Sequence, residues 1–126
     1  MRVIIAAGGT GGHIYPGIAV AKEILRSDET SEVLFVGTAR GLETRIVPEN
    51  GFQLTLINSA GLKNVGAAGK VKGLALLPQS FVEARRIMRE FKPDVVVGSG
   101  GYVSGPILLV ASLMRIPTLV MDSNAL

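Results

Sequence analysis

A run of residues near the N-terminus has a composition suited to binding an anion. It is Gly8-Gly9-Thr10-Gly11-Gly12-His13, called here the first glycine run. It follows the apolar run Val3–Ala7 and precedes a helical pattern. Glycines leave backbone N–H groups uncovered and permit left-handed dihedrals, and a helix N-terminus adds partial positive charge. The run therefore predicts a cradle for phosphate or pyrophosphate. A tight turn that needs glycine only for its geometry is the alternative. The dinucleotide fingerprint is incomplete, because Ile14 stands where its third glycine belongs, and no Walker lysine follows.

His13 is the only histidine of the chain and lies where the first glycine run enters the helix. A neutral imidazole beside a bound ligand could take a proton from a hydroxyl nucleophile. The alternative is a histidine that only hydrogen-bonds the loop.

A second glycine run, Gly98-Ser99-Gly100-Gly101-Tyr102-Val103-Ser104-Gly105-Pro106, follows the apolar residues Val95–Val97. Two such runs at neighbouring strand ends would form a concave wall rich in hydrogen-bond donors. Alternatively, the small residues let a helix approach the sheet closely. After the last apolar run come Asp122-Ser123-Asn124, which could contact a ligand or cap a helix.

Elements that would position these residues are visible as short apolar runs separated by helical patterns. The runs lack polar alternation, as strands buried on both faces of a parallel sheet do. Strands are expected at Val3–Ala7, Val33–Val36, Leu54–Ile57, Val95–Val97 and Thr118–Met121, and helices at Tyr15–Arg26, Leu42–Asn50, Gln79–Phe91 and Gly105–Met114. This alternation predicts an α/β fold with a Rossmann-like, doubly wound parallel sheet, in which ligands bind beyond the carboxyl ends of strands. The chain ends just after a strand, which indicates an excerpt from a longer polypeptide.

Composition limits the classes of function. The chain has 126 residues, 48% hydrophobic and 18% charged, which suits one α/β domain. The absence of cysteine excludes a disulfide framework and a cysteine-based metal site. Nucleic acid is a weak candidate partner, because aromatic residues make up 5% and no basic stripe is interleaved with them. No secretory signal is evident, and the apolar stretch Ile107–Met114 is too short to cross a bilayer.

A cationic and apolar segment precedes the expected helix at Gln79–Phe91. Lys70 and Lys72 stand near Leu74, Leu77 and Phe81, a pattern that would suit docking on anionic lipid headgroups. An ordinary amphipathic helix with its apolar face in the core is the alternative that the residues alone favour.

Taken together, the motifs resemble the MurG family of glycosyltransferases over the whole chain. The similar segments are the first glycine run with Pro16-Gly17 and Ala19, the pair Gly37-Thr38, the run Ser59-Ala60-Gly61-Leu62, the run Lys92-Pro93-Asp94-Val95-Val96, and the second glycine run. One motif departs: the family usually has His-Glu-Gln-Asn where this chain has Met121-Asp122-Ser123-Asn124.

The resemblance implies an inverting transfer of N-acetylglucosamine in peptidoglycan synthesis. The family moves this sugar from UDP-N-acetylglucosamine to undecaprenyl-pyrophosphoryl-N-acetylmuramyl-pentapeptide, converting lipid I to lipid II at the cytoplasmic face of the bacterial inner membrane. Its GT-B architecture has two Rossmann-like domains and uses no cofactor or chelated metal. Residues 1–126 would be the N-terminal domain, on the acceptor and membrane side. The C-terminal donor-binding domain would be absent, so this chain alone is expected to be inactive.

Site roles carried over by position follow from the same resemblance. Thr10, Gly11, Gly12 and Asn124 would contact the donor sugar nucleotide, His13 would be the candidate base, Gly100, Gly101 and Tyr102 would line the acceptor side, and Lys70, Lys72, Leu74, Leu77 and Phe81 would meet the membrane. Two other functions stay open. The chain could be the membrane-recruiting subunit of a split glycosyltransferase, or a non-catalytic module that binds phosphate or nucleotides.

Overall fold

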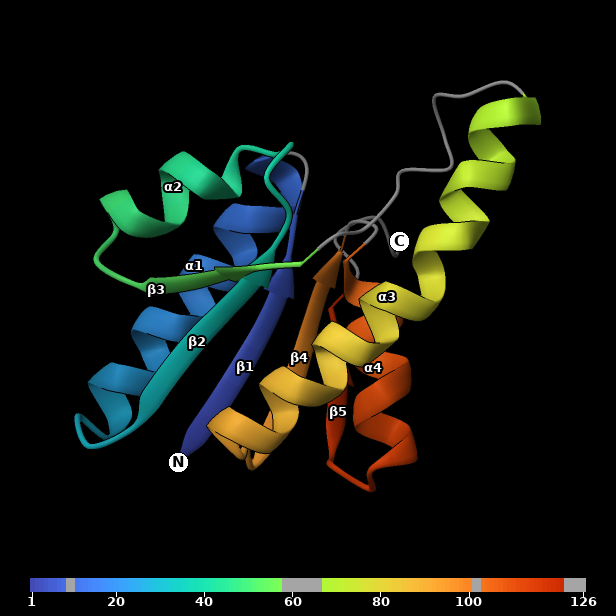
Figure 1. Ribbon diagram of the computed structural model, residues 1–126. Coiled ribbons are helices and arrows are strands. Elements are labelled where there is room, and N and C mark those ends of the chain that lie inside the picture. The colour runs from blue at the N-terminus through green and yellow to red at the C-terminus, as the bar shows by residue number, and fades with distance from the viewer. Residues whose placement is uncertain (9–10, 58–66, 101–102, 122–126) are drawn as a thin grey trace.

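Parallel strands form one sheet whose order reverses beside its first strand (Figure 1). The computed structural model describes residues 1–8, 11–57, 67–100 and 103–121, with residues 67–78 described by their backbone only. The strands are β1 (Arg2–Ala7), β2 (Glu32–Gly37), β3 (Gln53–Leu56), β4 (Val95–Gly100) and β5 (Thr118–Val120), in the order β3-β2-β1-β4-β5. Every adjacent pair is parallel. The predicted parallel sheet and its strands are therefore confirmed, with small shifts at the strand ends.

The helices agree with the prediction in order and type, but the first and the third begin several residues earlier than expected. They are α1 (Gly11–Ser27), α2 (Glu43–Glu49), α3 (Ala67–Phe91) and α4 (Ser104–Leu113). The expected starts at Tyr15 and Gln79 were wrong. Glycine costs a helix only about 1 kcal/mol relative to alanine, and α1 buries Ile14 and Ile18 directly after its glycines. Pro78 lies within α3, where a proline removes one backbone hydrogen bond without ending the helix.

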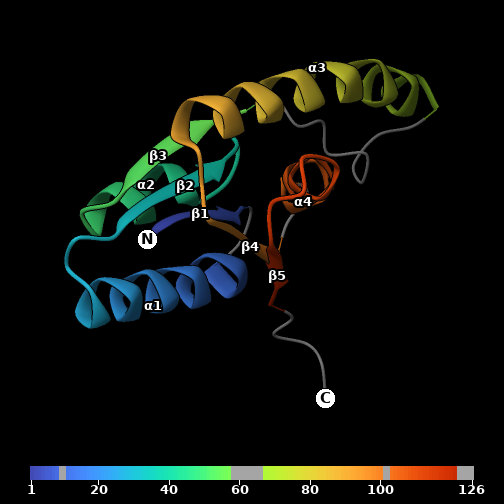
Figure 2. The ribbon, with the colours of Figure 1, turned by 90° about the horizontal axis from the view of Figure 1, so that it is seen from below.

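Two apolar cores lie on opposite faces of the sheet, as a doubly wound fold requires (Figure 2). Successive side chains of a strand point to opposite faces. Accordingly, Ile4 of β1 packs with residues of α3 and α4, whereas Ile5 packs with residues of α1 and α2. Among the described helices, none is long and apolar enough to span a lipid bilayer.

The strand order reverses between β1 and β4. The chain passes from β1 to β2 and β3 on one side, and then returns through α3 to β4 on the other side of β1. Sheets of this kind bind ligands at such a switch point, beyond the carboxyl ends of the strands. Since β1 and β4 lead into the two glycine runs, the expectation that both runs follow neighbouring strands is confirmed.

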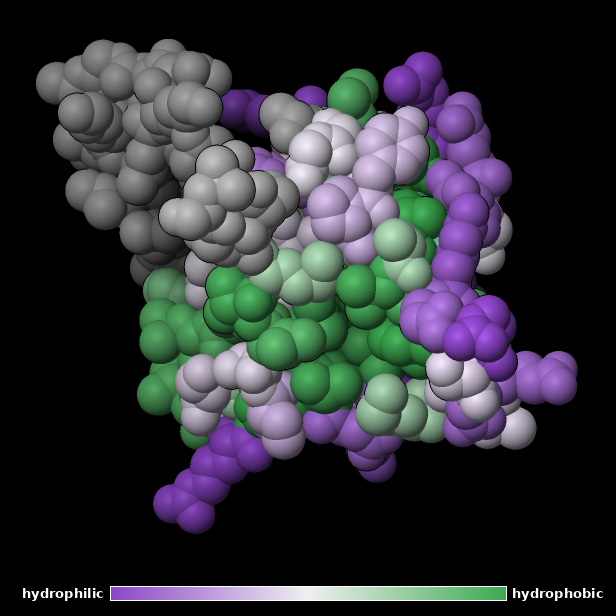
Figure 3. All heavy atoms as spheres, turned by 180° about the vertical axis from the view of Figure 1, so that it is seen from behind, coloured by the Kyte–Doolittle hydropathy of each residue, from purple (hydrophilic) through white to green (hydrophobic). Residues whose placement is uncertain are grey.

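The edge of the sheet formed by β5 is apolar and exposed to solvent. All three residues of β5 are exposed, with Leu119 at 54% and Val120 at 66%. Leu113 at the end of α4 is 75% exposed. Seen from behind, apolar side chains spread over the lower part of the molecule (Figure 3). Within the described residues, β5 pairs only with β4, so this edge can receive further packing.

Core packing on the α1 side predicts a large effect of Phe35→Ala. Phe35 is fully buried, and its ring centroid lies 5.3 Å from that of Phe52. Removing the ring leaves a cavity, so the free energy of unfolding should fall by about 3–5 kcal/mol, measured by chemical denaturation. Val82→Ala is the control, because Val82 is 69% exposed, and its effect should stay within about 0.5 kcal/mol. Similar losses for the two variants would contradict this assignment of the core.

Candidate functional site

The first turn of α1 presents uncovered backbone donors at the switch point. It contains Gly11, Gly12, His13 and Ile14, and the N–H groups of a first helical turn have no acceptor inside the helix. Gly12 is exposed, whereas Gly11 and His13 are half-buried. The partial positive charge of the helix start adds to these donors and favours a bound anion. The positions of Gly11 and Gly12 fit the predicted phosphate cradle, which stays a prediction.

The His13 side chain lies between the ends of β1 and β4. Its Nδ1 is 3.2 Å from the carbonyl oxygen of Gly8. A carbonyl oxygen can only accept a hydrogen bond, so Nδ1 carries the proton and donates it. In the neutral ring Nε2 then has a free lone pair, the state that a general base needs. This geometry is compatible with both readings of His13, whose role as a base stays a prediction.

Gly100 permits the ring of His13 to pack directly on the backbone of β4. A Cβ atom at Gly100 would lie 2.6 Å from His13 Cδ2, closer than any carbon contact allows. The φ angle of Gly100 is also +120°, in the region that favours glycine. Both space and backbone conformation thus require glycine there. Gly100, which was predicted only to line the acceptor side, is thus in direct contact with His13, and its acceptor-side role stays a prediction.

A β-bulge at Ser99 joins β4 to the helix start. Ala6 pairs with Gly98 and Ala7 pairs with Gly100, so Ser99 is the extra residue between them. The buried Ser99 hydroxyl donates a hydrogen bond to the backbone oxygen of His13. As a result, β4 holds His13 twice, through Ser99 to its backbone and through Gly100 to its ring.

Ser104, at the start of α4, ties the two strand ends together. Its hydroxyl oxygen accepts the N–H of Gly100 at 3.1 Å and lies 3.0 Å from the carbonyl oxygen of Ala6 and 2.9 Å from that of Gly100, its possible acceptors. The N–H of Gly8 donates to Gly100 O at 3.3 Å. The residues of the second glycine run thus anchor the residues of the first.

At the other glycine positions, different physical factors favour glycine. Among the described glycines only Gly51 and Gly100 have left-handed φ angles, so Gly100 uses the conformational freedom of glycine and Gly8 does not. A Cβ at Gly98 would lie 2.5 Å from Leu108 Cδ1 of α4, which supports the packing alternative there. Gly17 lies close to Ile5 and allows α1 to approach the sheet, as the third glycine of the dinucleotide fingerprint would.

Sequence reasoning missed Glu43, a fully buried carboxylate behind the first glycine run. The Thr38 N–H donates to Glu43 Oε2 at 3.1 Å. A Cβ atom at Gly8 would lie 2.5 Å from the same oxygen. The available signal was a glutamate in the first turn of the helix that follows Gly37-Thr38, a weak one, because acidic residues are common there.

Several predicted site residues lie outside the described part of the chain. They are Thr10, Gly101, Tyr102 and Asn124, together with Asp122 and Ser123 of the departing motif. For Lys70, Lys72, Leu74 and Leu77 only the helical backbone of α3 is described. Phe81 is partly buried and packs against the core on the α3 side, which agrees with the amphipathic-helix alternative at that position.

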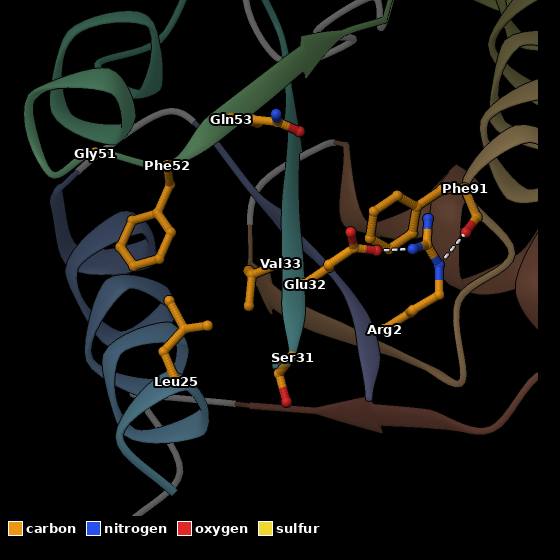
Figure 4. Close-up of a pocket in the computed structure, with 9 residues that line it drawn as sticks. All are labelled: Arg2, Leu25, Ser31, Glu32, Val33, Gly51, Phe52, Gln53 and Phe91. Atoms are coloured by element: carbon orange, nitrogen blue, oxygen red, sulfur yellow. Dashed lines mark hydrogen bonds and ion pairs between the residues drawn. The ribbon is translucent and has the colours of Figure 1, made fainter. Parts of the chain in front are cut away.

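A separate hollow of about 340 Å³ lies at the amino ends of the strands, away from both glycine runs (Figure 4). Arg2 at its wall forms an ion pair with Glu32. Arg2 Nε also donates to Phe91 O at 2.7 Å, and the guanidinium lies 4.3 Å from the centre of the Phe91 ring. Arg2 and Glu32, the charged groups at this wall, therefore already have partners within the domain.

Close packing of His13 on β4 predicts that Gly100→Ala disturbs the imidazole. The new methyl would collide with the ring and strain the backbone, so the unfolding free energy should fall by more than about 1 kcal/mol. The ¹⁵N shifts of His13, the only histidine here, should report a changed mixture of tautomers.

Gly105→Ala is the matched control, because nothing lies within 4 Å of a Cβ atom at Gly105 in α4. It should leave the His13 shifts unchanged and raise stability by about 0.5–1 kcal/mol. Unchanged stability and shifts in Gly100→Ala would show that the ring does not pack there.

Comparison with known proteins identifies the family. Residues 3–126 match the N-terminal domain of glycosyltransferase family 28. A relative from Anaeromyxobacter dehalogenans, described as UDP-N-acetylglucosamine--N-acetylmuramyl-(pentapeptide) pyrophosphoryl-undecaprenol N-acetylglucosamine transferase, is 53% identical over 126 residues, which are 100% of this chain and 33% of the relative. A relative of the same description from Myxococcus xanthus is 52% identical, with the same coverage.

A solved structure agrees with these relatives. The crystal structure of Acinetobacter baumannii MurG matches with a TM-score of 0.80 at 35% identity, covering 98% of this chain and 36% of that one. This chain spans about a third of the length of the curated relatives that it matches. Since the family match covers nearly all of its residues, the chain belongs to the glycosyltransferase family 28 N-terminal domain family.

Proposed function

We propose that residues 1–126 form the acceptor-side and membrane-side domain of a MurG-type glycosyltransferase. The whole enzyme transfers N-acetylglucosamine from UDP-N-acetylglucosamine to undecaprenyl-pyrophosphoryl-N-acetylmuramyl-pentapeptide, which completes lipid II for peptidoglycan. The observation that carries the proposal is the position of His13, in the first turn of α1 with Nδ1 bonded to Gly8 O and its ring against Gly100. The names of the relatives supply the substrates.

His13 acts as the general base of a direct displacement. Its Nε2 takes the proton of the C4 hydroxyl of the acceptor sugar while that oxygen attacks the anomeric carbon of the donor. The new bond joins this oxygen to the anomeric carbon, the bond from that carbon to the phosphate oxygen breaks, and UDP leaves with the electron pair. Attack from the opposite side inverts the anomeric centre. The N–H groups of Gly11 and Gly12 offset pyrophosphate charge through preorganised dipoles. The proposal requires no cofactor or metal.

The donor nucleotide requires a second domain in this proposal. The relatives are about three times as long as this chain, and we assign to the remainder a second Rossmann-like domain that holds uridine. The present chain contributes Thr10, Gly11, Gly12 and Asn124 to the donor and Gly100, Gly101 and Tyr102 to the acceptor side. By itself it binds donor weakly and does not complete a turnover.

Docking on the cytoplasmic face of the inner membrane is assigned to the amino-terminal half of α3. This half extends past the sheet while the other half packs on it (Figures 1 and 2). The extended part includes Lys70, Lys72, Leu74 and Leu77, a composition suited to anionic headgroups and the acyl boundary. Phe81 lies where the helix joins the body of the domain.

Substitution of the base tests the reaction. In the full-length transferase, His13→Ala should lower kcat about 100- to 10,000-fold with little change in the KM of either substrate, measured with UDP-N-acetylglucosamine and a lipid-pyrophosphate acceptor. Lys22→Ala, at an exposed position of the same helix, should leave kcat unchanged. Near-normal turnover by a folded His13→Ala enzyme would remove His13 from the catalytic role.

Charge reversal tests membrane docking. Lys70→Glu with Lys72→Glu should weaken binding of the full-length protein to vesicles containing anionic phospholipid by tenfold or more, measured by co-sedimentation, because each basic side chain near such a surface contributes about 1 kcal/mol. Arg89→Glu with Lys92→Glu is the control, since it changes the net charge equally at the end of α3 that packs on the sheet. Equal losses for both pairs would mean that binding follows net charge and not this segment.

A further inference from the structure

We propose that Glu43 is a positioning residue, which holds the backbone of Gly8 so that His13 keeps the tautomer needed for base catalysis. The inference rests on the proposed function, because it assigns Glu43 a role in the transfer that His13 promotes. The carboxylate acts through Gly8, whose carbonyl oxygen bonds His13 Nδ1.

The Glu43 side chain fills a space between the carboxyl ends of β1 and β2. It is fully buried, and its Oε2 accepts the backbone N–H of Thr38 at 3.1 Å. Cβ atoms added to the glycines that end or follow these strands would meet it directly: 2.5 Å from Oε2 at Gly8 and 2.6 Å from Cγ at Gly37. One side chain therefore packs against both strand ends.

A side chain at Gly8 or Gly37 would first meet the Glu43 side chain, and the backbone conformation does not exclude it. Neither residue has a φ angle in the left-handed region, so an L side chain would fit either backbone. The space for such a side chain is occupied by Glu43. This complementarity is expected when the position of a buried acidic group matters, because a buried carboxylate is costly unless it is hydrogen-bonded.

The surroundings of Glu43 stabilise a charged group in the interior. It is the first residue of α2, where the helix dipole favours negative charge. The Thr38 N–H donates to Oε2 at 3.1 Å, which is an ordinary hydrogen-bond length. These contacts hold the carboxylate in place, so it can act as a rigid stop for Gly8.

The path from Glu43 to the reaction is short. Gly8 is in van der Waals reach of the carboxylate on one side, and its oxygen accepts from His13 Nδ1 at 3.2 Å. If Gly8 moves into the space that Glu43 fills, this hydrogen bond lengthens and the other imidazole tautomer, with its proton on Nε2, gains population. That tautomer cannot accept a proton at Nε2, so the chemical step slows while substrate binding is retained.

Three variants of the full-length transferase test this path. Glu43→Ala should lower kcat tenfold or more with little change in either KM, as removal of a group that orients a catalytic residue does. Glu43→Gln keeps the shape and an oxygen for Thr38 N–H, and should retain kcat within about threefold. Glu49→Ala makes the alanine substitution at an exposed position of the same helix and should leave kcat unchanged.

A double-mutant cycle tests the contact itself. Gly8→Ala should lower kcat strongly in the wild-type background, because its methyl meets Glu43. In the Glu43→Ala background the same substitution should cost at least threefold less, since the collision is removed. Full rescue is not expected, because the methyl also lies 3.3 Å from Val103 Cγ1. Losses that simply multiply would overturn the proposed contact.

The ¹⁵N shifts of the His13 ring separate the two hypotheses. We expect Nδ1 protonated in the wild type and a mixture of tautomers in Glu43→Ala, with the His13 signals assigned by their loss in His13→Ala. A wild-type enzyme that fails to glycosylate the lipid acceptor would overturn the proposed function, and the ring shifts would still decide the role of Glu43. An unchanged tautomer, or a lower melting temperature with unaltered kcat in Glu43→Ala, would overturn the positioning role.

Discussion

The close approach of β1 and β4 at their carboxyl ends is the constraint on which the site depends. There the N–H of Gly8 bonds Gly100 O, and the His13 ring lies so near Gly100 that even a methyl would collide. The strand order reverses at this point, so that the connections leave in opposite directions, and sheets of this kind bind ligands at such a point. The same reversal brings together two glycine runs that are far apart in the sequence.

Buried polar side chains make this arrangement rigid. Ser99, Ser104 and Glu43 are each less than a tenth exposed, and each bonds the backbone at or beside the switch point. Within the part of the chain that the structure describes, no buried side-chain nitrogen or oxygen lacks a partner. Fully satisfied polar groups of this kind specify one backbone geometry, which the proposed base chemistry of His13 requires.

The outer parts of the domain are less enclosed than its centre. The interior near β1 is closed by helices on both faces, whereas β5 presents Leu119 and Val120 to solvent and α3 extends past the sheet. Exposed apolar surface at an edge and a projecting amphipathic helix are suited to contacts with something larger. In the proposed enzyme these contacts are the rest of the polypeptide and the membrane surface, while the chemistry stays at the rigid centre.

The sequence by itself determined the local elements and the chemical character of the site. Unalternated apolar runs such as Val3–Ala7 indicated a parallel sheet, and adjacency along the chain placed His13 beside a glycine run. Tertiary structure decided how these pieces meet. It placed Gly100 against the His13 ring, formed a β-bulge at Ser99 and buried Glu43 against Gly8. These residues lie on segments far apart in the sequence, and no local pattern predicts that they meet. Local propensity also misplaced the starts of α1 and α3, because it predicts helix boundaries at glycines and at Pro78, residues that these helices include. Periodicity in the sequence can reveal which face of an element is apolar. The side-chain contacts between strands, however, are determined only when the strands pair in the folded sheet.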